Sequence, residues 1–353
     1  MRHDSGDFAH ALAQLEACLA TGQWDAALEH ARDAGAIADR TGGDLIDIGG
    51  HLERLGDYRL AAHYLAKAGR QKWPTHLPEW DGGSLEGRTL LIVQRIRHVG
   101  AALRLARLIP QVTSRARRCI ILAENRLVPL FRRTFVGTDV FESGPDDEVA
   151  HSSADVVASY ETLMEHLVSD DESLAAELKP LVADPEHVSL LRQRYATSGE
   201  PLVGISWGST NSRKELPPLT DWAAWGLTKA KSYVSLQYGE ATSDIEFLRS
   251  SSGCRIIHDE SVDSLLDLDA FAAQVAAMDE VLCISNTAAH MAGALGVKAT
   301  VILDDKAHLT WPAYGNSSGF YPNLRLVRKN RRSWREVFAE ASSHPGAAHE
   351  AAK

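Results

Sequence analysis

The sequence predicts an α/β protein with two blocks of parallel β-sheet, preceded by an all-helical region. Three observations support this prediction. Residues 1–75 have helical patterns that contain a repeat, and a Pro/Gly-rich connector, PTHLPEWDGGSLEGR, follows at 74–88. From Thr89 onward, short apolar runs alternate with helical segments. Short buried strands that alternate with helices are typical of parallel sheets in α/β layers.

The helical region repeats itself. GQWDAALEHARDA begins at Gly22 and GDYRLAAHYLAKA begins at Gly56, 34 residues later, and this is the period of the tetratricopeptide helix–turn–helix. Matched residues follow each glycine: Trp24 with Tyr58, Ala27 with Ala61, and Ala34 with Ala68. The repeat predicts tetratricopeptide-like hairpins over 1–75. Two units are too few for a free-standing solenoid, so we expect them to pack on the next domain or on a second chain.

Seven apolar runs are candidate strands: 89–94, 118–122, 154–158, 202–207, 232–237, 280–284 and 299–303. They fall into two blocks, 86–195 and 200–330, and residues 331–353 form a C-terminal helix and tail. Ligands in doubly wound sheets bind beyond the carboxyl ends of the strands. Two such sheets facing one another would place a site in the cleft between them.

The composition limits the class of protein. The 47 Asp and Glu residues against 37 Lys and Arg give a net charge of −10, which argues against sequence-independent nucleic-acid binding. No run approaches about 18 apolar residues, and the start MRHDSGDFAH has no apolar signal region, so we expect a cytoplasmic protein without a transmembrane segment. The four scattered cysteines predict buried free thiols rather than disulfides or a metal site.

The segment EVLCISNTAAHMAGALG (280–296) changes character after its buried strand. Ser285, Asn286 and Thr287 occupy the junction between this strand and a helix. The unpaired amides and the dipole at a helix N-terminus suit an anion, particularly a phosphate. The alternative is that these are ordinary capping residues in a tightly packed βα unit, and that His290 is a packing residue rather than a catalytic one.

A second polar loop follows the strand at 202–207. Trp207 and Gly208 open it, and Arg213 and Lys214 supply an adjacent basic pair, which suits a diphosphate leaving group that needs cationic stabilisation. The alternative is a solvated surface pair. A third loop follows the strand at 232–237 and contains types suited to a base or a ribose, namely Gln237, Tyr238 and Gly239.

Four segments in order resemble one family: VGISWGSTNSRK, YVSLQYGE, FAAQVAAMDEVLCISNTAAHMAGALG and FYPNLRLVRK. They resemble the heptosyltransferase-like glycosyltransferases of family 9, and more narrowly the bacterial branch in which tetratricopeptide repeats precede the transferase. The connector resembles that branch too, and the likeness covers about 45–340. It implies a GT-B fold, with two Rossmann-like domains facing a cleft, and an inverting, metal-independent transfer from a nucleotide-sugar without a further cofactor.

The resemblance also implies roles for single residues. The phosphate loop of the family maps onto Ser285, Asn286, Thr287 and His290, and its basic residue maps onto Arg213 or Lys214. The loop around Gln237 would face the nucleoside. The final helix, at about 333–342, is expected to cross back onto the first domain.

One departure from the family concerns the base. Family members open the first domain with a glycine-rich turn followed by an Asp, the expected general base of the heptosyltransferases. In QRIRHVGAALRLARLIP, Gly100 aligns with the glycine and Ala101 with the acid, and alanine cannot accept a proton. His98 is a candidate substitute base. With Arg95 and Arg97 it makes this loop basic, which suits an anionic acceptor or donor.

The leading hypothesis is therefore a glycosyltransferase, with its nucleotide-sugar on 200–330 and a saccharide or protein acceptor on the 86–195 side. The helical repeats are candidates for binding a protein partner or a second copy of the chain. The alternative is a catalytically inactive GT-B binding or scaffold protein, which Ala101 favours. An epimerase or oxidoreductase is disfavoured because no G-x-G-x-x-G follows an early strand. The sequence does not identify the sugar, the nucleotide or the acceptor.

Overall fold

The computed structural model describes residues 2–96, 98–168, 178–196, 199–305 and 310–342, with side chains from residue 7 onward. The chain divides into two compact units. Unit 1 comprises 1–180 together with 307–320, and unit 2 comprises 181–306 together with 321–353. The finer domain boundaries given above stay a prediction.

Unit 1 begins with two helical hairpins, formed by α1 (Arg2–Thr21) with α2 (Trp24–Thr41) and by α3 (Ile46–Arg54) with α4 (Tyr58–Lys72). Gly22 and Gly56 have φ values of 73° and 91°, the left-handed conformation that glycine adopts without steric cost. The matched Ala27 and Ala61 are fully buried. Matched positions thus have matched roles, and the assignment as tetratricopeptide repeats stays a prediction.

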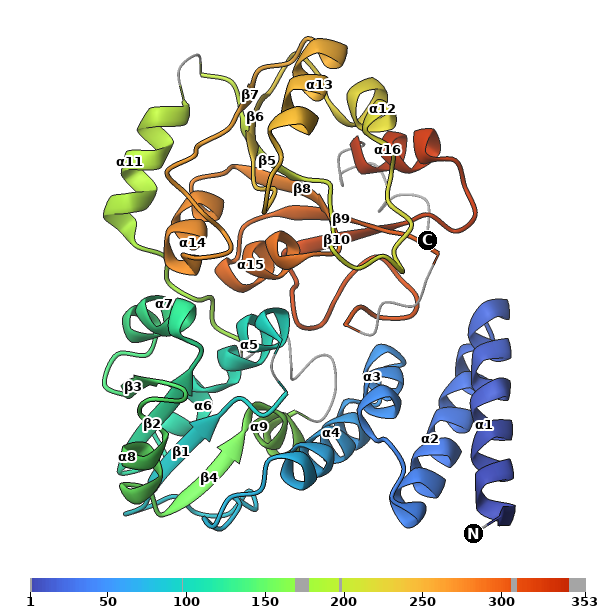
Figure 1. Ribbon diagram of the computed structural model, residues 1–353, viewed down its shortest axis with the longest axis vertical. Helices are drawn as coiled ribbons and strands as arrows, with labels where there is room; N and C mark the ends of the chain where they lie inside the picture. Colours follow the sequence, from blue (N-terminus) through green and yellow to red (C-terminus); the bar gives the residue numbers. More distant parts are fainter. Residues whose placement is uncertain (1, 97, 169–177, 197–198, 306–309, 343–353) are drawn as a thin grey trace, which may run out of the picture. The chain divides into compact units, whose positions relative to one another are not determined.

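The first sheet is parallel, with the order β3-β2-β1-β4 (Figure 1). Its strands are β1 (Thr89–Val93), β2 (Arg118–Ala123), β3 (Asp139–Glu142) and β4 (Val156–Ser159). The connecting helices are α5 (Val99–Leu105), η1 (Ala106–Leu108), α6 (Pro110–Thr113), η2 (Asn125–Leu127), α7 (Val128–Thr134), α8 (Asp147–Ser152) and α9 (Tyr160–Leu167). Helix α4 packs against α9, so the helical hairpins lean on this α/β layer.

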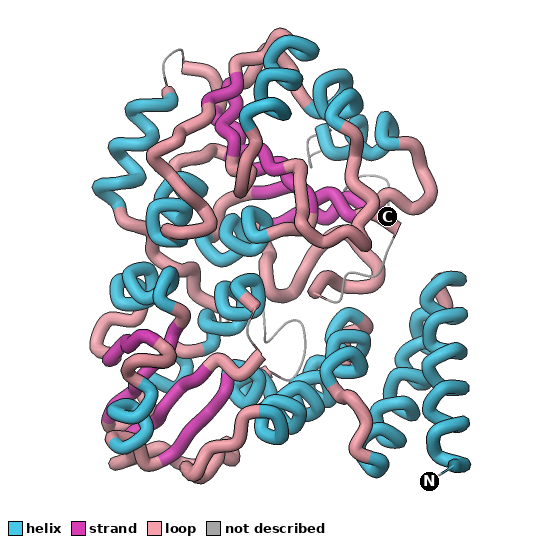
Figure 2. Tube along the Cα trace, viewed as in Figure 1, coloured by secondary structure: helices cyan, strands magenta, loops and turns pink. Residues whose placement is uncertain are grey.

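The second sheet is also parallel, with the order β10-β9-β8-β5-β6-β7. Its strands are β5 (Leu202–Ser206), β6 (Ser232–Ser235), β7 (Ile256–Ile257), β8 (Glu280–Ile284), β9 (Ala299–Leu303) and β10 (Leu324–Arg328). The helices of unit 2, cyan in Figure 2, are α11 (Pro185–Tyr195), α12 (Leu219–Asp221), η3 (Trp222–Gly226), α13 (Thr242–Ser252), α14 (Leu268–Ala276), α15 (Thr287–Leu295) and α16 (Trp334–Ser342).

The predicted fold class is confirmed: two parallel α/β sheets follow a helical region. All seven predicted strands are present, and the structure adds β3, β7 and β10. The expectation for the final helix was wrong. Val337 and Phe338 of α16 are fully buried in the core of unit 2, and the Phe338 ring lies edge-on to Trp222 at 5.1 Å. Residues 343–353 of the predicted tail lie outside the described residues.

Residues 310–320 follow β9 in sequence but belong to unit 1. The Ala313 amide donates a hydrogen bond to the Arg54 carbonyl at the end of α3, at 2.7 Å. The buried Phe320 ring lies 4.4 Å from the Arg104 guanidinium. A segment distant in sequence therefore completes the packing of unit 1.

Candidate functional site

The sheet of unit 2 has a switch point between β5 and β8. From β5 the chain adds β6 and β7 on one side, and it then adds β8, β9 and β10 on the other. In doubly wound sheets the ligand crevice lies beyond the carboxyl ends of the strands at such a point. The loops that begin at Trp207 and Ser285 follow these two strands. The structure therefore places both predicted phosphate-side loops at the switch point.

Asn286 joins the two loops. Its Nδ2 donates to Ser206 Oγ at 2.7 Å and to the Gly208 carbonyl at 3.2 Å. Its Oδ1 accepts a hydrogen bond from the Ala288 amide at 3.0 Å and so caps α15. Asn286 is buried, whereas Thr287 in the first turn is partly exposed. The capping interpretation is thus correct for Asn286, and the same contacts fix the α15 N-terminus beside β5.

Gln237 fixes the loop after β5. Its Oε1 accepts hydrogen bonds from Ser206 Oγ at 3.1 Å, the Trp207 amide at 3.0 Å and the Gly208 amide at 2.7 Å. A Cβ on Gly208 would lie 2.9 Å from Gln237 Nε2, so this close approach requires glycine. The carboxamide oxygen of Gln237 is therefore committed to the protein, and contact of this loop with a nucleoside stays a prediction.

Two aromatic residues anchor the same loop. The Tyr238 hydroxyl accepts a hydrogen bond from the Thr210 amide at 2.7 Å. The Trp207 indole donates to Asp244 Oδ2 of α13 at 2.9 Å, and Trp207 is buried. Gly239 turns the chain after β6 with a φ of 75°. The predicted nucleoside-side residues thus hold the loop after β5 in place.

Lys214 lies inside the site. Its ammonium donates a hydrogen bond to the Ser285 carbonyl, just beyond β8. Burial lowers the pKa of Lys214, and the nearby charge of Asp304 partly opposes this shift. A partly desolvated ammonium attracts an anion more strongly than one in bulk water. The solvated-surface alternative therefore does not describe Lys214.

Arg213 differs from its neighbour. Its backbone amide donates to Asn211 Oδ1 at 3.0 Å, while the residue is exposed. Within the described part of the chain its guanidinium makes no hydrogen bond or ion pair. Arg213 thus fits the surface alternative that the sequence left open.

His290 is buried in α15, with Nδ1 3.2 Å from the Tyr321 hydroxyl. The two rings are 5.8 Å apart, and the Tyr321 ring also lies against Gly293, where a Cβ would come within 2.5 Å of it. The geometry agrees with the packing interpretation of His290. Its contacts hold α15 against the segment before β10.

Sequence analysis missed Asp304. This residue directly follows β9 and is largely buried, and its carboxylate accepts a hydrogen bond from the Glu215 amide. It therefore holds the end of the loop that carries Lys214. The rule that points to the carboxyl ends of strands could have identified it, because Asp304 stands immediately after a predicted strand.

The sheet of unit 1 has its own switch point between β1 and β4, where Val93 pairs with Ser159. Beyond it, His98 is exposed at the start of α5, and its side chain makes no capping hydrogen bond. Gly100 and Ala101 lie in the first turn of this helix. Arg97 lies outside the described residues.

Arg95 is not a surface cation. It is 4% exposed, pairs with Glu79, and packs against Gly69 of α4, where a Cβ would lie 3.2 Å from its side chain. One of the three basic residues expected in this loop, Arg95, therefore points into the protein and is paired there. His98 remains exposed near this turn.

Glu161 is a second buried charge beyond this switch point. It is 2% exposed, and its Oε2 has no hydrogen-bond partner among the described residues. Burial raises the pKa of Glu161 to about 6, although hydrogen bonds to its own amide and to Ser159, and the charges of Arg95 and Arg104, act in the opposite direction. The carboxyl group titrates near neutral pH.

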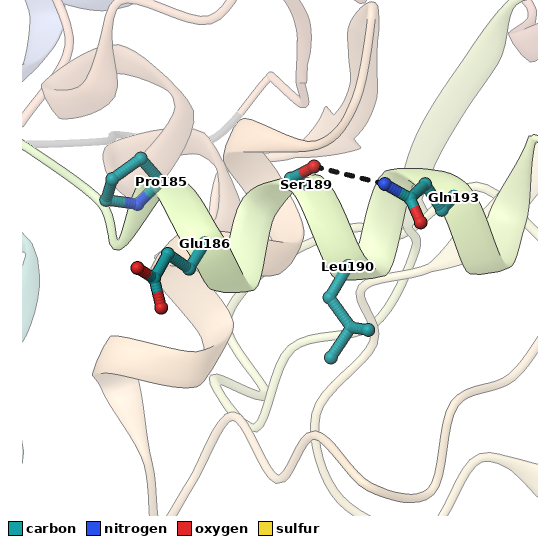
Figure 3. A pocket seen from close by; sticks show the side chains of 5 residues that line it. All are labelled: Pro185, Glu186, Ser189, Leu190 and Gln193. Atoms are coloured by element: carbon teal, nitrogen blue, oxygen red, sulfur yellow. Dashed lines mark hydrogen bonds between the residues drawn. The ribbon is translucent and has the colours of Figure 1, made fainter.

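A further candidate site lies in unit 2. A surface hollow of about 430 Å³ runs along α11 and is lined by Pro185, Glu186, Ser189, Leu190 and Gln193 (Figure 3), none of which was a predicted site residue. Among the described residues, no group of three or more His, Cys, Asp or Glu side chains is placed to hold a metal ion. In the same part of the chain, every helix is too short or too polar to cross a membrane.

Comparisons with known proteins support the fold. No family model matches the chain. Over 269 residues it is 27% identical to protein FlbA of Caulobacter vibrioides, and the match covers 70% of this chain and 44% of that protein. The chain therefore spans less than half the length of this relative.

Two solved structures are similar to it. The glycosyl transferase family 9 protein of Veillonella parvula has a TM-score of 0.51 at 11% identity, covering 70% of this chain and 87% of that chain. The ADP-heptose lipopolysaccharide heptosyltransferase II of E. coli also has a TM-score of 0.51, at 13% identity, covering 71% of this chain and 97% of that chain. The chain has a GT-B-like fold.

Proposed function

We propose that this chain is a glycosyltransferase that binds a nucleotide-activated sugar at the carboxyl edge of the unit 2 sheet. One observation carries the proposal: the N-terminus of α15, capped by Asn286, and the Lys214 ammonium come from different loops and meet at the switch point between β5 and β8. Helix N-termini and lysine ammonium groups are both suited to phosphate.

The diphosphate of the donor would lie against the first turn of α15, near Thr287, with Lys214 beside it. As the bond to the sugar breaks, negative charge grows on the leaving diphosphate, and a fixed cation stabilises this charge. Asp304 and the Ser285 carbonyl hold Lys214 in place for this purpose. The loop anchored by Gln237 and Tyr238 would face the nucleoside.

The reaction is an inverting displacement, as the family resemblance implies. An acceptor hydroxyl oxygen attacks the anomeric carbon, the bond from that carbon to the phosphate oxygen breaks, and the nucleoside diphosphate leaves. The hydroxyl proton passes to a base. His98 is the base that we propose, because it is an exposed imidazole at the start of α5, one helical turn from the position of the family carboxylate. A protein partner at the helical hairpins and a cytoplasmic location belong to the same proposal.

A second candidate function is nucleotide-sugar binding without transfer. Ala101 favours it, because no carboxylate occupies that position, and so does the burial of Arg95 in an ion pair. The two functions share the unit 2 site and differ only in what unit 1 does.

Thermal unfolding in ADP, UDP, GDP, CDP and CMP tests the donor site. At about 100 times its dissociation constant, a bound nucleotide adds roughly 2.7 kcal/mol of stability. Lys214→Ala should lose most of this effect, whereas Lys298→Ala, at an exposed lysine of the same unit, should keep it. If none of the five nucleotides stabilises the chain, the donor site is wrong.

Turnover then separates the two functions. With the nucleotide that binds, His98→Ala should lower sugar transfer and leave nucleotide affinity unchanged. Binding without transfer by the parent chain, over a panel of saccharide and protein acceptors, would favour the non-catalytic function.

A further inference from the structure

Arg54, the last residue of α3, is a partly buried cation without a counter-charge among the described residues. Its Nε and Nη1 are buried and have no hydrogen-bond partner, and among the described residues its side chain enters no ion pair. Burial lowers the pKa of Arg54, but an arginine stays charged at any pH a protein experiences. A buried charge with unfilled donors is unfavourable unless an acceptor satisfies it.

The neighbouring arginines show that unit 1 normally supplies such acceptors. Arg104 forms a buried ion pair with Glu53, the residue just before Arg54. Arg107 donates to backbone carbonyl groups, among them that of Lys179 at 3.1 Å. The Arg54 guanidinium, in the same unit, forms no ion pair with a carboxylate and no hydrogen bond to a carbonyl group among the described residues. Among the described residues, no group accepts a hydrogen bond from its Nε or Nη1.

His51 lies one turn earlier on the same face of α3. Its Nδ1 is also buried without a hydrogen-bond partner. Burial, followed by the charge of Arg54, lowers the pKa of His51 to about 4, and Asp47 acts weakly in the other direction. At neutral pH the imidazole is therefore uncharged, and in one tautomer Nδ1 carries a hydrogen that it can donate.

The pair is not sealed from solvent, because Arg54 and His51 both remain partly exposed. The Ala313 amide donates to the Arg54 carbonyl, so residues 310–320 run beside it. Unpartnered nitrogens of a guanidinium and of an imidazole thus lie one turn apart at the end of α3. A guanidinium edge presents two parallel N–H groups, which match the two oxygens of a carboxylate or a phosphate.

We infer that Arg54 and His51 form an oxyanion site in the helical region, which takes the phosphate or carboxylate group of a small ligand. The anion would accept hydrogen bonds from the guanidinium edge of Arg54 that carries Nη1 and from His51 Nδ1. This site is separate from the diphosphate site of unit 2 and does not depend on the proposed function.

The test follows the His51 ring by NMR in the full chain, during titrations with inorganic phosphate and with acetate at constant ionic strength. A bound anion favours the imidazolium form, so phosphate, acetate or both should raise the pKa of His51. Arg54→Met should weaken this binding about 10- to 100-fold, as expected for loss of charged hydrogen bonds. Arg59→Met, at an exposed arginine of α4, is the control and should bind like the parent chain.

The two sites are distinguished by Lys214→Ala, which should leave the His51 response intact. Arg54→Met removes a partly buried unpaired charge, so in phosphate-free buffer it should unfold at the same temperature as the parent chain or higher, and lost binding would not reflect misfolding. The anion that moves the His51 resonance identifies the group that the site takes. If neither anion moves it, or if Arg54→Met responds like the parent, the inference is wrong and water satisfies the guanidinium.

Discussion

Replacing Glu161 by glutamine should stabilise the protein at neutral pH. The folded state raises the pKa of this carboxyl from 4.5 to about 6, chiefly through burial. The protonated form is thus the one that the fold favours. Its contribution to stability is fully present below pH 4.5 and is lost as the pH rises through 6.

The magnitude follows from the size of the shift. A difference of about 1.5 pKa units corresponds to about 2 kcal/mol. Above pH 7 the ionised Glu161 therefore lowers the free energy of unfolding by about that amount. Glutamine has the shape of the protonated acid and no charge, and Arg95 and Arg104 keep their own partners, Glu79 and Glu53.

The assay is urea unfolding of both proteins between pH 4.5 and pH 8. We expect equal stability at the acidic end and a growing advantage for Glu161→Gln that levels off at about 2 kcal/mol. Glu86→Gln, at an exposed carboxylate of unit 1, should show no such trend. An advantage independent of pH, or a variant less stable than the parent at pH 8, would refute the reasoning.

Two further predictions concern unit 2. Gly293→Ala should lower the free energy of unfolding of unit 2 by about 1–2 kcal/mol, because a Cβ at this position would lie 2.5 Å from the Tyr321 ring. This overpacking outweighs the gain in helix propensity. An unchanged melting temperature would contradict the prediction. Asp304→Asn should lower the pKa of Lys214 further, because Asp304 now raises it. Nucleotide affinity should then be lost at a lower pH than in the parent chain, which calorimetric titrations at several pH values would measure. The same pH dependence of affinity in both proteins would contradict this prediction.

The strands that sequence analysis found and missed differ in a physical way. All of the missed strands, β3, β7 and β10, lie at the edge of a sheet. An edge strand has one neighbour and partial exposure, so it need not be a continuous apolar run: β10 reads LRLVR, with two arginines among its five residues, and β7 has only two residues. Buried central strands such as β5 and β8 are the apolar runs from which strands are predicted in a sequence.

The candidate site was predictable to the level of loops but not of contacts. The carboxyl-end rule identified the loops after β5 and β8. It could not show that the side-chain oxygen of Gln237 accepts hydrogen bonds from the end of β5 and from two amides of the loop that follows, or that Asn286 contacts Ser206, 80 residues away in sequence. Such contacts depend on which strands become neighbours. Whether the Arg54 guanidinium finds a partner depends on the residues that surround it in the fold. The local sequence around Arg54 does not reveal those neighbours.

The return of residues 310–320 to unit 1 has a consequence for synthesis. The ribosome delivers the chain from its N-terminus, and unit 1 lacks Ala313 and the buried Phe320 until residues 181–306 of unit 2 have been made. The end of α3, and the side of Arg104 that packs against Phe320, therefore stay uncovered while most of unit 2 is being synthesised. Ending the chain before residue 310 would leave unit 1 permanently open at that face, so unit 1 completes its packing only after most of unit 2 has been made.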